Sequence, residues 1–258
     1  MFLFILFLNL LIASPEDKKV EVGIVEHLGG YVDKEMMLVN STGDTIKLKD
    51  ILTKPTVVSL VYYNCPGICN VLLSGLRDVI ERADIEPGKD YNILSLSFNH
   101  NENYVLARNK KHNYLAGMKR EINSDAWYWT VSDSTSIRKF CDELGFKFKI
   151  DIIEEGRLDF LHAGALIFLS PDGKITRYLN GTEFLPFDLK MASIEAAEGK
   201  PQPTINKVLA LCFKYDPEGR SYVLNVTRIF GVIILLGVGT LIFVLTRSKK
   251  KKNTEVEV

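Results

Sequence analysis

The chain has 258 residues, of which 47% are hydrophobic, so it can bury one sizeable core and still have sequence left for targeting and anchoring. Its 32 lysines and arginines balance its 32 aspartates and glutamates, and no overall basic excess indicates a nucleic-acid partner. The charge is unevenly placed, because a basic cluster lies at the C-terminus.

Residues 1–13 are predicted to be a signal peptide or a short N-terminal hydrophobic segment. Their apolar stretch of about a dozen residues is too brief for a comfortable membrane span and matches the hydrophobic region of a signal peptide. Ala13 and Ser14 offer small residues at a cleavage point. Residues 14–30 are polar and contain glycine, which predicts a linker between the membrane and the domain that follows.

Residues 31–215 are predicted to form one domain in which strands and helices alternate. Runs of β-branched and aromatic residues predict strands, apolar residues at helical spacing predict helices, and glycine-containing turns predict hairpins. The order is typical of an α/β fold with a terminal antiparallel pair, the arrangement of thioredoxin-like domains. The expected elements are a hairpin at 36–48, strands at 56–63, 91–98 and 127–131, helices at 70–83, 104–118, 135–144 and 204–213, and a second hairpin at 164–181.

Cys65 and Cys69 lie where the predicted strand at 56–63 turns into the next helix. On a helix, residues at this spacing share a face with alpha carbons about 6 Å apart, a separation that a disulfide or a shared metal ion can bridge. A helix N-terminus also favours the thiolate, which is both the nucleophile in disulfide exchange and the metal ligand. A redox pair and a metal clamp both remain open, whereas a purely structural disulfide across so short a loop would stabilise little.

Two thiolates in a site poor in carboxylates favour Cu(I), with Zn(II) as the next candidate, and a third ligand is then expected. The candidate is His162, which stands immediately before a predicted buried strand, at the rim of the sheet. Cys141 and Cys212 align with apolar residues at helical spacing and are expected to be buried. A disulfide between these last two is a minor hypothesis.

The C-terminal part of the chain predicts a membrane anchor. Residues 229–246 carry no charge and would reach about 27 Å as a helix, which is enough to span a bilayer. Residues 216–228 are expected to be a juxtamembrane linker, and residues 247–258 a basic cytoplasmic tail, because positive charge marks the cytoplasmic side. The domain at 31–215 would then lie in an extracytoplasmic, oxidising space.

The chain resembles the Sco/SenC family of copper-binding, thioredoxin-like proteins, which assemble the CuA centre of cytochrome c oxidase, in two motifs, VYYNCPGICNVLLSGL and FLHAGALIFLSPDGKITRYLNG. The similarity runs from about Glu26 through Gly219. Two later segments, GTEFLPFDLKMASIEAAEGK and LCFKYDPEGRSY, resemble the C-terminally anchored bacterial branch of this family. The resemblance implies that Cys65, Cys69 and His162 are the copper ligands.

Three positions differ from better-known members of that family. Those members have an aspartate inside the cysteine motif and a proline after it, where this chain has Gly67 and Asn70. They also often have an aspartate just before the histidine, where this chain has Leu161. The ligands are all present, but the surroundings that tune copper affinity and redox potential are expected to differ.

The leading function hypothesis is a membrane-anchored extracytoplasmic protein that binds copper, as Cu(I) with Cu(II) as a second state, and delivers it to the CuA site of cytochrome c oxidase. Its partners would be the copper-accepting oxidase subunit and the lipid bilayer. It would be located in the bacterial cytoplasmic (inner) membrane as a single-pass protein. Its main domain would lie on the periplasmic or extracytoplasmic side and its C-terminus in the cytoplasm. The alternative is an enzyme, a thiol–disulfide reductase that keeps the oxidase subunit cysteines reduced. Cys65 and Cys69 would then be the redox pair, and His162 would not be required.

Overall fold

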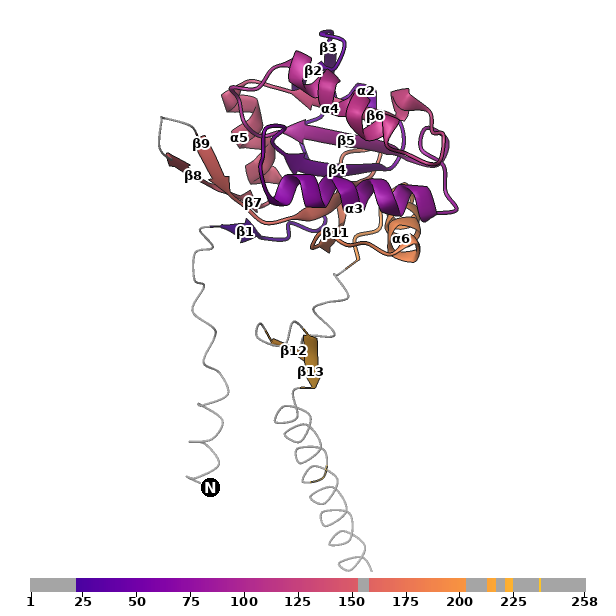
Figure 1. Cartoon of the computed structure of the whole chain (residues 1–258). Coiled ribbons are helices and arrows are strands. Elements are labelled where there is room, and N and C mark those ends of the chain that lie inside the picture. Colours follow the sequence, from indigo (N-terminus) through magenta and orange to yellow (C-terminus); the bar gives the residue numbers. More distant parts are fainter. Residues whose placement is uncertain (1–21, 153–157, 203–212, 217–220, 225–236, 238–258) are drawn as a thin grey trace, which may run out of the picture. The chain divides into compact units, whose positions relative to one another are not determined.

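The computed structural model of the chain describes residues 22–152, 158–202, 213–216, 221–224 and Gly237 (Figure 1). The chain divides into two compact units, Met1–Gln202 and Pro203–Val258. The first unit contains the central sheet and every residue of the candidate site described below.

A seven-stranded sheet forms the centre of the first unit, in the order β11-β10-β4-β5-β6-β2-β3. The neighbours β4, β5 and β6 run parallel, whereas every other neighbouring pair is antiparallel. The strands are β2 (Met37–Asn40), β3 (Thr45–Lys47), β4 (Thr56–Val61), β5 (Asn92–Ser97), β6 (Trp127–Val131), β10 (Ala165–Leu169) and β11 (Ile175–Asn180).

Helices make the connections between the parallel strands. Helix α3 (Ile68–Arg82) links β4 to β5, and α4 (Tyr104–Ala116) links β5 to β6. Such crossovers are right-handed, which places these two helices on the same face of the sheet. Helix α6 (Pro186–Ala197) follows the β10–β11 hairpin and packs against α3 (Figure 1). A strand–helix–strand unit followed by an antiparallel hairpin and a helix is the thioredoxin-like arrangement, so the predicted α/β fold class is confirmed.

Local sequence explains these elements. All residues of β4 are buried, as expected for a β-branched strand in the middle of a covered sheet. Helix α4 begins after Asn103, whose side chain accepts a hydrogen bond from the Leu106 N–H, and α5 (Ser134–Glu143) begins after Asp133, which accepts from the Thr135 N–H. These side chains satisfy N–H groups that the first turn of a helix leaves without partners.

The remaining elements of the first unit lie around the sheet. They include a helical turn α2 (Leu48–Ile51), a 3₁₀ turn η1 (Ser124–Ala126), the pair of β1 (Gly23–Ile24) with β7 (Phe146–Lys147), and the pair of β8 (Lys149–Ile152) with β9 (Leu158–Leu161). Strands β8 and β9 lie apart from the central sheet, at the left of Figure 1. Cys141, on α5, is 2% exposed, so its predicted place in the core is confirmed.

The structure corrects the predicted N-terminal boundary of the domain. Residues 14–30 were expected to be a linker, but from residue 22 on they join the domain. Strand β1 pairs with β7, and the Gly29 N–H donates to the Ile175 carbonyl at 2.8 Å. A polar, glycine-containing segment can serve as an edge segment when its backbone groups find partners, and composition alone does not reveal this.

Several C-terminal predictions fall outside the described residues. They concern residues 1–13, the helix at 204–213 except for Phe213, Cys212, the span at 229–246 except for Gly237, and the tail at 247–258. Phe213 starts β12 (Phe213–Asp216), which pairs with β13 (Ser221–Leu224). Among the helices that the structure describes, none combines the length and apolarity needed to cross a bilayer.

Gly75 lies where α3 passes close to the β11–α6 loop. A β-carbon built at Gly75 would stand 1.8 Å from the carbonyl oxygen of Thr182, so the backbone would have to move. We expect Gly75→Ala to lower the free energy of unfolding by about 1–3 kcal/mol, the usual cost of overpacking, although alanine alone would favour the helix by about 1 kcal/mol. Val71→Ala, at a position 54% exposed on the same helix, should change it by less than about 0.5 kcal/mol. Urea unfolding checks both, and unchanged stability of Gly75→Ala would contradict the close approach.

Candidate metal centre

Cys65, Cys69 and His162 lie together where β4 ends and α3 begins. Their sulfur and imidazole nitrogen atoms all lie within 4.8 Å of one another, and Sγ of Cys69 is 3.1 Å from Nε2 of His162. The side chains are 5%, 0% and 7% exposed, respectively. The fold therefore brings together the three residues that the sequence singled out, although 93 positions separate Cys69 from His162.

The strand–helix junction positions the two cysteines. Strand β4 ends at Val61 and α3 starts at Ile68, so Cys65 lies in the connecting turn and Cys69 in the first turn of the helix. The backbone N–H of Gly67 donates to Sγ of Cys65 at 3.3 Å, and that of Tyr62 donates to Sγ of Cys69 at 3.4 Å. These N–H groups, together with the positive end of the helix dipole, stabilise negative charge on sulfur.

The histidine is held so that one ring nitrogen faces the sulfurs. His162 follows β9, and its Nδ1 lies 2.9 Å from the carbonyl oxygen of Ala163. Because a carbonyl can only accept, Nδ1 carries the proton and Nε2 keeps its lone pair toward Cys69. The rings of Tyr62 and Phe98 pack edge-on to the imidazole, with centroids 6.2 and 5.0 Å away. Nε2 is therefore presented as a ligand atom.

The two thiols differ in acidity. A hydrogen bond from Cys69 holds the pKa of Cys65 far below its usual range and outweighs the effect of burial, which acts in the opposite direction. The pKa of Cys69 is raised well above its usual range, because its proton is engaged by Cys65 and because it is buried. At neutral pH the pair therefore holds one proton, with Cys65 as the thiolate.

This donor set fits a soft metal ion. Sulfur and imidazole ligands stand about 2.0–2.3 Å from a bound ion, so two ligands of one ion are at most about 4.6 Å apart. The observed spread, within 4.8 Å, needs only small side-chain adjustments. Within the described part of the chain no carboxylate belongs to the group, and two sulfurs with one imidazole suit Cu(I) or Zn(II) better than hard cations.

Glu102 is a residue of this site that sequence reasoning missed. Its buried carboxylate accepts hydrogen bonds from the N–H groups of Tyr63 and Asn64, at 2.7 and 2.8 Å, and from the Ser97 hydroxyl at 2.7 Å. These bonds hold the backbone directly before Cys65. The available signal was position, because Glu102 follows β5 and the C-terminal ends of parallel strands meet at one edge of the sheet.

Asp159 joins the histidine-bearing strand to the cysteine-bearing turn. The Tyr62 hydroxyl donates to Oδ1 of Asp159 at 2.8 Å, and Asp159 lies in β9, just before His162. Burial and the neighbouring Cys65 and Asp159 raise the pKa of Tyr62, so this hydroxyl remains a donor. Leu161, on the same strand and directly before His162, is in contrast 62% exposed, so its side chain is not part of this buried contact.

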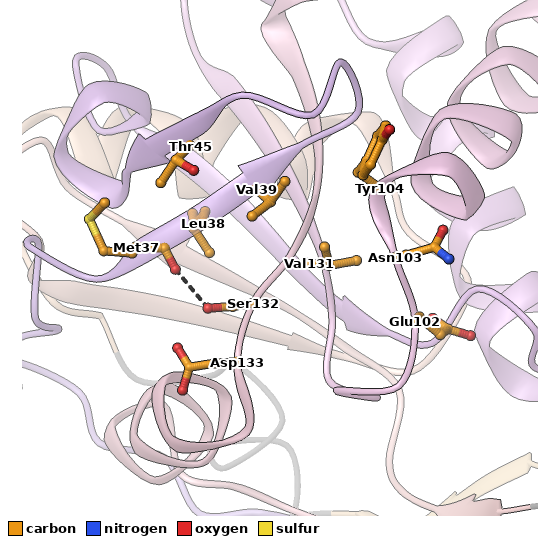
Figure 2. Close-up of a pocket in the computed structure, with 10 residues that line it drawn as sticks. All are labelled: Met37, Leu38, Val39, Thr45, Glu102, Asn103, Tyr104, Val131, Ser132 and Asp133. Carbon is orange, nitrogen blue, oxygen red and sulfur yellow. Dashed lines mark hydrogen bonds between the residues drawn. The ribbon is translucent and has the colours of Figure 1, made fainter.

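A separate pocket of about 380 Å³ lies beside the start of α4 (Figure 2). Figure 2 shows Glu102 and Asn103 on the side of the pocket opposite Met37 and Thr45. The pocket touches the candidate metal centre only through Glu102, because neither cysteine nor the histidine lines it. The metal centre is therefore a tight cluster of side chains rather than a part of this cavity.

Comparison with known proteins places the first unit among relatives of one family. A family model described as SCO1/SenC matches residues 27–195. A curated SCO1 protein homolog from Bacillus subtilis is 23% identical over 162 residues, covering 61% of this chain and 78% of that protein.

Two solved structures share the fold of the first unit. Copper-bound ScoI from Arabidopsis thaliana is similar with a TM-score of 0.53 at 13% identity, covering 66% of this chain and 98% of that one. BsSco, a member of the Sco family of cytochrome c oxidase assembly proteins in which a disulfide switch was identified, is similar with a TM-score of 0.50 at 19% identity, covering 68% and 97%.

Proposed function

The chain belongs to the SCO1/SenC family, and on that premise we propose that it is a membrane-anchored extracytoplasmic protein that binds copper and delivers it to the CuA site of cytochrome c oxidase during assembly. The observation that carries the proposal is the buried group of Cys65, Cys69 and His162, with Nε2 of the histidine facing the sulfurs. Copper is here the cargo of the protein. The copper-bound relative supports this choice of metal among the soft ions.

The residues of the site explain how copper would be taken up and released. Cys65 supplies a thiolate at neutral pH, and binding displaces the remaining proton from Cys69. His162 supplies a neutral nitrogen whose orientation Ala163 already determines. A soft ligand of the accepting oxidase subunit can then replace these ligands one at a time, so copper passes without being released into water.

The proposed setting is the bacterial cytoplasmic membrane. The uncharged residues 229–246 would form the single anchor, residues 247–258 would lie in the cytoplasm, and the domain would face the periplasm or extracytoplasmic space. The copper-accepting subunit of cytochrome c oxidase would be the partner. Anchoring in the same bilayer raises the effective concentration of the partner, so modest affinity between the two proteins suffices.

A second candidate function is a thiol–disulfide reductase acting on the cysteines of the same oxidase subunit. The difference between the pKa values of the two thiols favours this function, because Cys65 would attack as a thiolate while Cys69 keeps its proton. That reaction has no need of His162. We favour the metallochaperone, because Nε2 of His162 lies within 4.8 Å of both sulfurs and so completes a three-ligand set that the reductase reaction does not need.

The test is a transfer experiment with the reduced full chain in detergent. We expect it to take up one Cu(I) in competition with a chelator, and to pass that copper to the metal-free soluble domain of an oxidase subunit that carries the CuA cysteines. The His162→Ala variant should fail to transfer copper but still reduce a disulfide in that domain. Equal copper transfer by His162→Ala and wild type would overturn the role of His162 as the third ligand. A wild-type chain that takes up no Cu(I) in competition with the chelator would overturn the metallochaperone and leave the reductase in its place.

A further inference from the structure

The turn that carries Cys65 is tied to helix α4 through Asn70. The Asn70 side-chain amide donates to the carbonyl oxygen of Cys65 at 2.7 Å, and its Oδ1 accepts from Nζ of Lys110 at 2.9 Å. The Tyr114 hydroxyl donates to the Asn70 carbonyl at 3.2 Å. Lys110 and Tyr114 stand one helical turn apart on α4. Hydrogen bonds to the side-chain oxygen and the main-chain oxygen therefore hold Asn70 in place, and its side-chain amide points at the backbone of Cys65.

The same part of the chain holds the turn from its other side. Glu102, two residues before the start of α4, accepts hydrogen bonds from the N–H groups of Tyr63 and Asn64. The backbone is thus bound directly before Cys65 and at the Cys65 carbonyl itself. We call the contacts of Glu102, Lys110 and Tyr114 with this turn, including Asn70, the α4 clamp.

The α4 clamp acts on a turn that must change shape on oxidation. A disulfide brings its two sulfurs to about 2.05 Å, whereas two ligands of one ion stand on opposite sides of it, up to about 4.6 Å apart. Both cysteines are buried, but Cys69 lies on α3, where helical hydrogen bonds hold the backbone, whereas Cys65 lies in the turn before the helix, so we expect the turn to make the movement. Such a movement pulls the Cys65 carbonyl away from the Asn70 amide.

From this geometry we propose that Asn70, held by Lys110, is a positioning residue that keeps Cys65 in the dithiol arrangement and so sets the equilibrium between dithiol and disulfide. The inference rests on the proposed function only in taking the dithiol as the form that loads copper. A proline, which better-known relatives have at this position, has neither a side-chain donor nor a side-chain acceptor and cannot make these contacts. The clamp is thus a property of this chain's own residues.

The equilibrium can be measured without copper. In buffers of reduced and oxidised glutathione, the Cys65 thiolate and the Cys69 thiol lose two electrons and one proton and form one S–S bond. One glutathione disulfide takes up these two electrons, this proton and one further proton from water, and becomes two glutathione thiols. Alkylation of the remaining thiols, followed by mass analysis of the peptide that contains both cysteines, gives the oxidised fraction of the metal-free full chain in detergent. This readout does not register Cys141 or Cys212.

We expect Asn70→Ala to shift the equilibrium toward the disulfide by about tenfold, equivalent to about 30 mV, because hydrogen bonds made only in the dithiol state are lost. Asn70→Asp keeps an acceptor for Lys110 but loses the donor to Cys65, so it should shift the equilibrium in the same direction. Val71→Ala, an exposed neighbour on α3, serves as the matched control and should stay within twofold of wild type.

A shift of less than twofold in Asn70→Ala, or a shift toward the dithiol, would overturn the proposal. If Asn70→Ala does not fold, Lys110→Met, at a half-buried position of α4, provides a second variant. We expect it to shift the equilibrium toward the disulfide by less than Asn70→Ala does. An unchanged equilibrium in Lys110→Met would contradict the role of the α4 clamp. A purely structural role of Asn70 would lower the unfolding temperature and leave the equilibrium unchanged. Copper uptake and transfer by the wild-type chain test the proposed function separately, so either idea can fail alone.

Discussion

Cys65→Ser is expected to weaken Cu(I) binding by more than about 100-fold. Substitutions of residues that only support metal ligands already cost about 10- to 100-fold, and this one removes a ligand itself. The serine hydroxyl is hard and stays protonated at neutral pH, whereas Cu(I) prefers a soft thiolate. Serine is also close to cysteine in size, so the buried turn should remain folded.

Competition of the reduced full chain against a Cu(I) chelator measures this effect, and thermal unfolding confirms that the variant is intact. Cys141→Ala is the matched control, because Cys141 is a buried cysteine on α5 outside the candidate centre. It should bind Cu(I) as the wild type does. If Cys65→Ser and Cys141→Ala bound Cu(I) equally, Cys65 would not be a ligand.

Glu102→Ala is expected to lower the free energy of unfolding by about 3 kcal/mol. The substitution leaves the buried N–H group of Tyr63 and the partly buried N–H group of Asn64 without their acceptor, and an orphaned buried donor costs about 1–3 kcal/mol. Ser97 loses its 2.7 Å bond to the carboxylate but can turn its hydroxyl to the Asn99 carbonyl, 3.4 Å away. The backbone before Cys65 should loosen, so Cu(I) affinity should fall as well.

Chemical denaturation of the metal-free chain measures the loss of stability. Glu121→Ala is the matched control, because Glu121 is an exposed glutamate in the segment after α4, and it should change the free energy of unfolding by less than about 0.5 kcal/mol. Glu102→Gln keeps one oxygen acceptor and should fall between wild type and Glu102→Ala. A Glu102→Ala protein as stable as the Glu121→Ala protein would show that water replaces the carboxylate at no cost.

Much of the fold could be predicted because its signals are local. Each residue of β4 is apolar, β-branched or small, and this composition indicates a strand covered on both faces wherever it occurs. The helix after the cysteines could be predicted from apolar residues that recur along one face, and the structure buries that face. Segment 22–30, which was expected to be part of a linker, could not be recognised as part of the domain. Its place beside β7 and β11 depends on backbone partners more than a hundred positions away.

The candidate site shows the same division. By itself the sequence determined that Cys65 and Cys69 lie at a strand–helix junction. The structure differs in one respect, because Cys65 lies in the turn before α3 and not on the helix, so helical spacing alone does not explain how the two cysteines meet. His162 could be named as a candidate, but only the packing of β9 beside the start of α3 decided that its nitrogen faces Cys69. Glu102 and Asn70 carry no such local signal. Their roles come from hydrogen bonds between segments far apart in the chain, whose partners only the tertiary structure selects.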